Sequence, residues 1–145
     1  MQRRLQLCGI RPISVIVDIT NYVLLETGHP LHAFDDALCK EKSVIVNDVD
    51  KETVIKTLDD IDRTLHPGMA MISLANNPVA VAGVMGGKST EVSETTTDIF
   101  LEAAYFDPIS IRRTAQALGL RTESSIRFEK GVPADTVDYL SLIHI

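Results

Sequence analysis

Between residues 44 and 104, short apolar runs alternate with clusters of turn residues, and this pattern constrains the fold more than any other feature of the sequence. The turn clusters are Asp59-Asp60, His66-Pro67-Gly68 and Asn76-Asn77-Pro78. Apolar runs of this length between such residues are typical of strands joined by tight loops. We therefore predict that the middle of the chain is a β-meander, with strands at 44–46, 53–58, 63–65, 69–74, 79–84 and 98–104.

The N-terminal part of the chain carries helical signals instead. Residues 1–8 resemble the last turns of a helix that ends at Gly9. From Ser14, a residue that can cap a helix, apolar side chains recur every three or four positions as far as Gly28. This spacing predicts a helix over 14–27, with a strand as the alternative because β-branched residues are dense in the same segment.

The segment after the strands also begins with a helix signal. Asp107 is a typical N-cap, Pro108 suits the first helical position, and Gly119 is a typical helix end. We predict a helix over 108–118. The chain is thus expected to hold a β-rich centre between two helical ends.

Length and hydropathy fit a single domain without a membrane segment. A chain of 145 residues can bury a real core. Its longest nearly continuous apolar run, 79–85, is far shorter than the ~20 residues that cross a bilayer. We expect a soluble, cytoplasmic protein with no membrane contact. Cys8 and Cys39 show neither metal-binding nor redox spacing, so we interpret them as small hydrophobic residues.

The charge of the chain is acidic overall but uneven. A formal net charge of −6 argues against a stand-alone protein that binds nucleic acid by bulk electrostatics. Basic residues nevertheless gather between 112 and 130, where Arg112, Arg113 and Arg121 are weak candidates for contact with a phosphate backbone. The alternative for this segment is an ordinary solvated helix face.

Glu102 is the residue that most requires an explanation. It lies inside the apolar run 99–106, and burying an unpaired carboxylate is costly. One interpretation is a structural ion pair with Arg112 or Arg113. The other is a carboxylate kept available for a ligand.

Three other polar side chains are candidates for a site. His32, in the segment His29-Pro30-Leu31-His32, is able to orient a water molecule or hold a nucleoside as a neutral imidazole. A hydrogen-bonded core histidine is the alternative. Thr20 and Asn21 offer hydroxyl and amide groups for a substrate amino group or a water, with local helix capping or packing as the other interpretation.

Several ordered motifs together resemble a known family. They are 11–12 (RP), 17–23 (VDITNYV), 29–35 (HPLHAFD), 57–59 (TLD), 64–67 (TLHP), 82–87 (AGVMGG), 101–102 (LE), 106–112 (FDPISIR), 118–123 (LGLRTE) and 127–131 (RFEKG). The chain closely resembles the beta subunit of bacterial phenylalanyl-tRNA synthetase, namely its editing module of fused third and fourth domains. The resemblance covers about 1–133, and we expect 134–145 to be a truncated or non-native tail.

The resemblance implies a fold and an activity. The fold is α+β, a compact sandwich-like core of antiparallel or mixed strands flanked by helices at both ends. The activity is post-transfer editing, in which tyrosine wrongly esterified to tRNA(Phe) is hydrolysed. The partners are then the acceptor end of tRNA(Phe) and the alpha subunit. No cofactor is expected in this part of the enzyme, because ATP and Mg²⁺ bind elsewhere, and this fragment alone is not expected to activate an amino acid.

The resemblance also assigns roles to particular residues. Glu102 would read the tyrosine hydroxyl, and His32, rather than His29, would be the second catalytic residue. The substrate-binding residues would be Thr20, Asn21, Gly83, Gly86, Gly87, Thr122 and Ser124. Weak contacts with tRNA would come from Arg112, Arg113 and Arg121. Because the sequence shows no catalytic triad and no metal-ligand pattern, we expect direct attack by a positioned water.

Two departures from the family pattern stand out. Asp59-Asp60 replaces the usual Asp-Gly of a hairpin, which costs a favourable turn residue and is expected to touch no site. Ser124 replaces a small alanine of the pocket wall and adds a hydroxyl. The alternatives in function are a non-catalytic tRNA-contacting or scaffold domain of the same synthetase, and a free-standing trans-editing deacylase.

Overall fold

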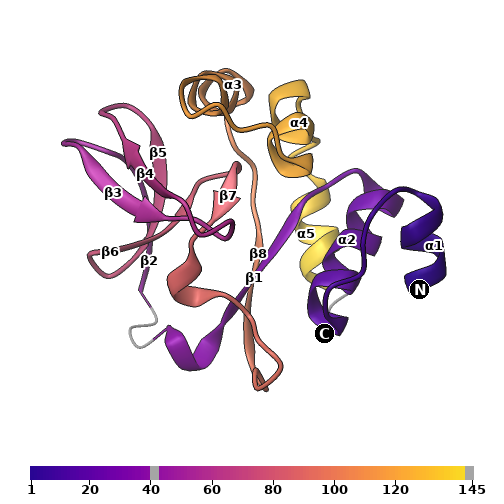
Figure 1. The fold of residues 1–145 in the computed structure, drawn as a ribbon. Helices are drawn as coiled ribbons and strands as arrows, with labels where there is room; N and C mark the ends of the chain where they lie inside the picture. The colour runs from indigo at the N-terminus through magenta and orange to yellow at the C-terminus, as the bar shows by residue number, and fades with distance from the viewer. Residues whose placement is uncertain (40–42, 143–145) are drawn as a thin grey trace.

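An antiparallel pair of strands, distant in sequence, runs through the middle of the molecule. The computed structural model describes residues 1–39 and 43–142. In it, β1 (Leu31–Asp35) pairs with β8 (Ile99–Ala103). Figure 1 shows this pair between the other strands on one side and α1, α2 and α5 on the other. The sequence predicted β8 but not β1, whose residues Leu-His-Ala-Phe-Asp have little β-branching.

The remaining strands form two small antiparallel units. One sheet has the order β2-β5-β6-β7, made of β2 (Val44–Asp48), β5 (Ala70–Leu74), β6 (Asn77–Val81) and β7 (Met85–Gly86). A separate hairpin is made of β3 (Thr53–Lys56) and β4 (Asp62–Leu65). The prediction of a simple meander is therefore wrong between β2 and β5. These two strands pair with each other, and strands β3 and β4, which lie between them in sequence, pair with one another in a separate two-stranded sheet.

Strand β6 starts two residues earlier than predicted and includes a proline. Pro78 lies opposite Ser73, at the point where the register between β5 and β6 shifts. A proline cannot donate to the ladder of hydrogen bonds, so it is tolerated at such an irregularity. Asn76-Asn77-Pro78 is thus only partly a turn.

The predicted helices at both ends are confirmed. They are α1 (Gln2–Leu7), α2 (Val15–Thr27) and α3 (Pro108–Ala117). Ser14 accepts a hydrogen bond from the Val17 amide, at 3.3 Å, as the N-cap of α2, so the helical interpretation of this segment holds over the strand. Two helices that the sequence analysis did not predict follow, α4 (Glu123–Lys130) and α5 (Thr136–Leu142), and the 3-10 turns are η1 (Asp36–Leu38) and η2 (Lys88–Thr90).

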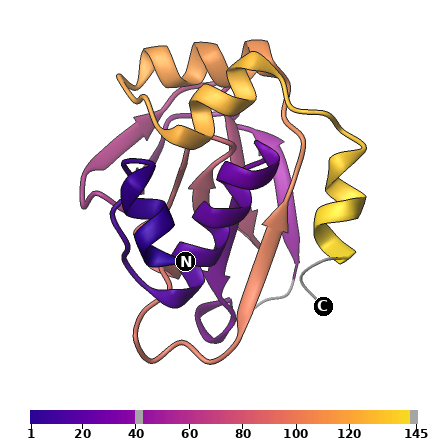
Figure 2. The ribbon, with the colours of Figure 1, turned by 90° about the vertical axis from the view of Figure 1, so that its right-hand side faces the viewer.

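The helices cover two sides of the strands. Figure 2 shows α3 and α4 across one end of the molecule and α5 beside β8, while α1 and α2 lie together. The side chain of Leu140 on α5 is fully buried. Within the described residues, none of the helices is long and apolar enough to cross a membrane. The α+β class predicted from the sequence is confirmed.

A single apolar cluster links the four-stranded sheet to α3 and α4. Phe106 and Phe128 meet edge to face with ring centroids 5.0 Å apart, and Ile111 is 1% exposed beside them. Gly83, at a φ of +65°, lies against this cluster. A β-carbon there would come within 2.8 Å of the Phe106 and Ile111 side chains, so this glycine is needed for the packing of α3 and α4.

The β3–β4 turn holds Asp60 in the left-handed region, at a φ of +62°. This conformation costs a residue with a β-carbon about 1 kcal/mol. Asp60→Gly is therefore expected to raise the free energy of unfolding by about 0.5–1 kcal/mol. The gain is reduced by loss of the exposed ion pair between Asp60 and Lys88 (3.2 Å), which contributes little. Urea denaturation would measure the change, and a destabilised Asp60→Gly protein would contradict this account.

Candidate functional site

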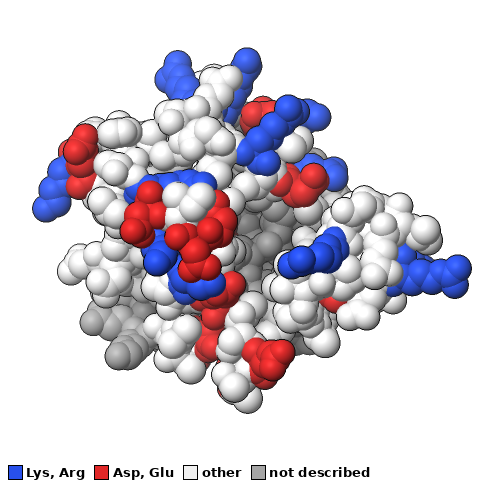
Figure 3. Space-filling view, viewed as in Figure 1, with Lys and Arg blue, Asp and Glu red and all other residues white. Residues whose placement is uncertain are grey.

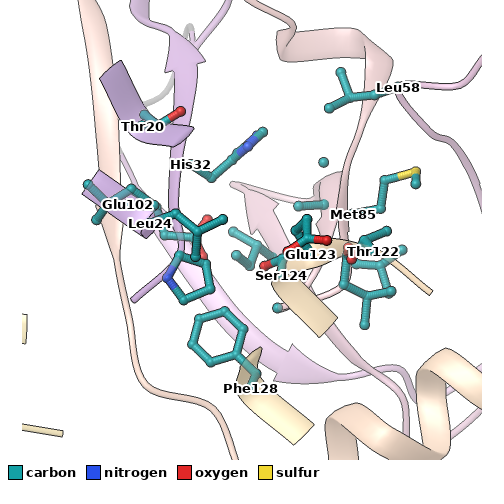
Figure 4. A pocket seen from close by; sticks show the side chains of 18 of the residues that line it. Thr20, Leu24, His32, Leu58, Met85, Glu102, Thr122, Glu123, Ser124 and Phe128 are labelled. Atoms are coloured by element: carbon teal, nitrogen blue, oxygen red, sulfur yellow. Dashed lines mark hydrogen bonds between the residues drawn. The ribbon is translucent and has the colours of Figure 1, made fainter. Parts of the chain in front are cut away.

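A pocket of about 410 Å³ lies where α2, the β1–β8 pair, β7 and the N-terminus of α4 meet. The surface is hollowed near the centre of the face in Figure 3. Figure 4 shows Thr20, His32 and Glu102 on one side, with Leu58, Met85 and Thr122 across the space from them. Of the residues predicted from the sequence, the pocket brings together Thr20, Asn21, His32, Gly83, Gly86, Glu102, Thr122 and Ser124.

His32 and Glu102 are partners across the two central strands. The register of β1 and β8 places them directly opposite each other. Residues opposite each other in an antiparallel pair project from the same face of the sheet, with β-carbons about 5 Å apart. Strand pairing thus delivers both side chains to one pocket wall.

Glu102 has no polar partner. Its side chain is half-buried, and within the described residues it forms neither a hydrogen bond nor an ion pair. The alternative of an ion pair with Arg112 or Arg113 is therefore wrong. Burial raises the pKa of Glu102 to about 7, because the surroundings solvate the charged form poorly. At neutral pH this carboxyl group is poised between its two protonation states.

His32 is neutral at physiological pH. Burial lowers its pKa to about 4. Its ring meets that of Phe34 edge to face, with centroids 4.5 Å apart. Gly86 closes the other approach, since a β-carbon there would lie 2.5 Å from Cε1 and 2.6 Å from Nε2 of His32. The imidazole therefore occupies a slot that only a glycine at position 86 leaves open.

His29, three residues before His32, is structural. It is fully buried, with Nδ1 2.8 Å from Oγ1 of Thr136 and Nε2 2.9 Å from the carbonyl oxygen of Ala104. These contacts tie the end of α2 to α5 and to the residue after β8. His29 is not among the residues that line the pocket.

The hydroxyl and amide groups around the pocket differ in availability. Oγ1 of Thr20 donates to the carbonyl oxygen of Val17, at 2.9 Å. Oγ1 of Thr122 donates to the carbonyl oxygen of Val84, at 2.7 Å, and caps α4. No such bond within the described residues engages the side chain of Asn21. Asn21 is thus the amide that remains free for a ligand.

Gly83, Gly86 and Gly87 each exclude a side chain for a different steric reason. Gly87 does not line the pocket. A β-carbon on it would lie 2.5 Å from the carbonyl oxygen of Val79, so the strand pairing itself excludes a side chain. Gly83 borders the pocket, but the steric demand at its α-carbon comes from the aromatic core. Gly86 is the glycine whose missing side chain shapes the pocket.

The sequence analysis missed part of the wall. Leu24, Leu58, Asp59, Met85 and Glu123 also line the pocket. Asp59 contradicts the expectation that the Asp59-Asp60 turn touches no site. The Arg63 guanidinium bonds its carboxylate at 2.7 and 2.8 Å and holds its pKa well below its usual range. The amide of Leu58 donates to the Gly86 carbonyl oxygen (3.1 Å), a non-local contact that no sequence motif signalled.

The three arginines proposed for tRNA contact lie outside the pocket. Arg112 and Arg121 border a second groove, between α3 and α4, together with Lys130. Arg113 borders a different depression beside the loop at Gly68. In residues 1–39 and 43–142, no group of three or more His, Cys, Asp or Glu side chains is placed to hold a metal ion.

The raised pKa of Glu102 predicts a pH-dependent stability. Because the folded-state pKa, about 7, exceeds the ordinary 4.5, the folded protein loses stability as pH rises from 4.5 to 7. Glu102→Gln removes this loss without breaking a contact. We expect Glu102→Gln to be more stable than the parent above pH 7 by up to about 3 kcal/mol, and equal to it near pH 4.

Chemical denaturation of both proteins at pH 4, 6 and 8 measures this difference. His32 acts in the opposite direction, since its lowered pKa costs stability as pH falls from 6.5 to 4. That effect is present in both proteins and cancels. A difference that does not change with pH would contradict the assigned environment of Glu102.

Comparison with known proteins identifies the relatives of this chain. A family model described as the B3/4 domain matches residues 1–141. The beta subunit of phenylalanine–tRNA ligase from Halalkalibacterium halodurans is 52% identical over 132 residues, which are 91% of this chain and 16% of that protein. The same subunit from Carboxydothermus hydrogenoformans is 48% identical over 137 residues, covering 94% of this chain and 17% of that protein.

The likeness extends to a third relative. The beta subunit of phenylalanine–tRNA ligase from Synechococcus elongatus is 51% identical over 138 residues, or 91% of this chain and 17% of that protein. The chain thus spans about one sixth of the length of the curated relatives it matches. The family match runs past residue 133 and includes most of α5; the assignment of 134–145 as a truncated or non-native tail stays a prediction.

Proposed function

Because the chain belongs to the B3/4 domain family, as found in phenylalanine–tRNA ligase beta subunits, we propose that its pocket is a post-transfer editing site. The reaction is hydrolysis of tyrosine from tRNA(Phe). Water attacks the ester carbonyl carbon, the bond from that carbon to the ribose oxygen breaks, and the ribose oxygen receives a proton. The products are tyrosine and tRNA with a free terminal hydroxyl.

The observation that carries this proposal is the unpaired carboxyl group of Glu102 in the pocket wall. A synthetic site that holds phenylalanine in an apolar pocket discriminates only about 10²-fold against an analogue with one added hydroxyl. An editing site must do the reverse and accept tyrosine. A half-buried acceptor without a protein partner does this, because the phenol satisfies it and the phenyl ring of phenylalanine leaves it desolvated.

His32 has a positioning role in this proposal. A pKa of about 4 makes its imidazole a weak base at neutral pH. It stays neutral, and one ring nitrogen is then able to accept a hydrogen bond from a water or from the terminal ribose. An aminoacyl ester is labile, so holding the water near the carbonyl carbon supplies much of the rate enhancement.

Asn21 and Glu123 complete the polar lining. Asn21 offers a free amide on the α2 side, and Glu123 lines the pocket at the start of α4. The partners and the location follow from the family and stay proposals. The partners are the acceptor end of tRNA(Phe) and an alpha subunit that activates the amino acid with ATP and Mg²⁺. The location is the cytoplasm.

The test is a comparison of two esters. Tyrosyl-tRNA(Phe) and phenylalanyl-tRNA(Phe) are incubated with the full chain, and release of each amino acid is measured against the rate without protein. We expect faster release of tyrosine only, and loss of that release in His32→Ala. A folded chain that leaves both rates at background would refute catalysis and favour a tRNA-contacting scaffold. Equal acceleration of both esters would refute selective editing.

A further inference from the structure

Helix α4 separates two cavities of different chemistry. Its N-terminal residues Thr122, Glu123 and Ser124, together with Phe128, line the pocket of Glu102. Ser125, Glu129 and Lys130 line the second cavity, a groove of about 460 Å³ whose other wall is the C-terminal half of α3. The helix has eight residues, so it is about 12 Å long, and an α-helix with its side chains is about 10–12 Å across. The two cavities are therefore separated only by one short helix.

The groove carries three cations without protein partners. Arg112, Arg121 and Lys130 line it, and none of them forms a hydrogen bond or ion pair within the described residues. The nearby Arg127, in contrast, lies 3.8 Å from Glu123. Glu129 is the one carboxylate in the lining of this groove. The groove is thus a local positive region on a chain whose net charge is −6.

The surface over α3 and α4 also carries basic side chains. Figure 3 shows several Lys and Arg side chains there with fewer Asp and Glu side chains between them, whereas over the β3–β4 side of the same face Asp and Glu side chains gather, interspersed with Lys and Arg. A polyanion is therefore attracted more strongly to the α3–α4 side of this face.

We infer that the α3–α4 groove binds the phosphates that precede the terminal nucleotide of an RNA 3′ strand whose ester lies in the adjacent pocket. The inference rests on the proposed function, because the ester in the pocket is what brings RNA to α4. Arg121 is the residue immediately before Thr122, so a strand leaving the pocket over the N-terminus of α4 meets its guanidinium first. Guanidinium groups bind phosphate in a bidentate manner, and the Lys130 ammonium adds a point charge.

The test measures binding of deacylated tRNA, which has no ester, to the full chain over a range of salt concentrations. The variant is the double reversal Arg112→Glu/Arg121→Glu. The matched control is Arg3→Glu/Lys51→Glu, which changes the net charge equally at two exposed residues that do not line the groove. We expect the groove variant to weaken binding about tenfold or more, and to reduce the slope of log K against log salt by about 1.4, or about 0.7 for each lost phosphate contact. The control should change neither by as much.

Glu129→Gln provides a change of opposite sign. Removal of the one carboxylate of the groove is expected to strengthen RNA binding severalfold, an effect that loss of folding cannot imitate. Circular dichroism confirms that each variant is folded. Equal effects of the groove and control variants, no binding by the parent chain at low salt, or no gain in Glu129→Gln would overturn the inference.

The outcome is separable from that of the proposed function. A chain that binds deacylated tRNA through the groove but hydrolyses no ester would refute editing and leave the phosphate groove supported. A chain that hydrolyses tyrosyl-tRNA, and whose RNA binding is unaffected by the groove variant, would refute the groove and leave editing supported.

Discussion

Gly86→Ala is expected to reduce hydrolysis of tyrosyl-tRNA about 100-fold, although it adds only one methyl group. The new β-carbon would lie 2.5 Å from Cε1 of His32 and 3.1 Å from Cδ1 of Leu58. Contacts under 3 Å force a neighbour to move, and the rigid imidazole is the nearest. A displacement of about 1 Å in a positioning group costs on the order of 10² in rate. Overpacking should also cost about 1–3 kcal/mol of stability.

The measurement is deacylation of tyrosyl-tRNA with a thermal melt of the same preparation. Gly68→Ala is the matched control. Its glycine has a φ of +87°, so alanine destabilises the backbone, but the added methyl group meets nothing within 4 Å and lies outside the pocket. If Gly86→Ala loses activity only in proportion to stability, as Gly68→Ala would, then Gly86 has no role in holding the imidazole.

Glu102→Ala should abolish most of the preference for tyrosine. A hydrogen bond to a charged acceptor contributes about 1.5–3 kcal/mol, so the ratio of the tyrosyl to the phenylalanyl deacylation rate is expected to fall about 10- to 150-fold. Glu94→Ala, an exposed carboxylate outside the pocket, is the control. An unchanged ratio in folded Glu102→Ala would mean that Glu102 does not read the phenol.

The same ratio should depend on pH in the parent protein. The carboxylate is a stronger acceptor than the neutral acid, and the pKa of Glu102 is about 7. The ratio should therefore rise between pH 6 and 8, whereas base-catalysed loss of both esters cancels in it. In Glu102→Ala the ratio should be flat with pH.

Local signals explain which parts of the fold the sequence predicted. Ser14 and Asp107 are N-caps and Gly28 ends a helix, and each of these signals acts within a few residues along the chain. Helices α2 and α3 accordingly lie where the sequence predicted them. Strand β1 has a weak local signal and is stabilised by pairing with β8, a contact that local spacing does not reveal. Helix α4 differs, because Thr122 and Ser125 form a capping box and Gly131 follows the helix. These local signals were present in the sequence, and the sequence analysis did not use them.

The site was predicted residue by residue but not as an arrangement. Glu102 was identified because an isolated carboxylate in an apolar run has few explanations. Its position opposite His32 depends on a strand pairing that no local pattern specifies. Asp59 was missed because the β3–β4 hairpin brings it to the pocket through the contact between Leu58 and Gly86. The roles of the lining residues in binding and catalysis stay predictions.

The register of β1 against β8 has a consequence for how this domain tolerates changes in length. Side chains alternate between the two faces of a strand, so one residue inserted within Ile99–Ala103 would turn Glu102 away from the pocket while His32 stayed in it. Residues 91–98, which lead into β8 without regular structure, can absorb an insertion and leave the register intact. Insertions and deletions among proteins related to this chain should therefore occur before residue 99. A related protein with an insertion or deletion inside the strand is expected to lack the site.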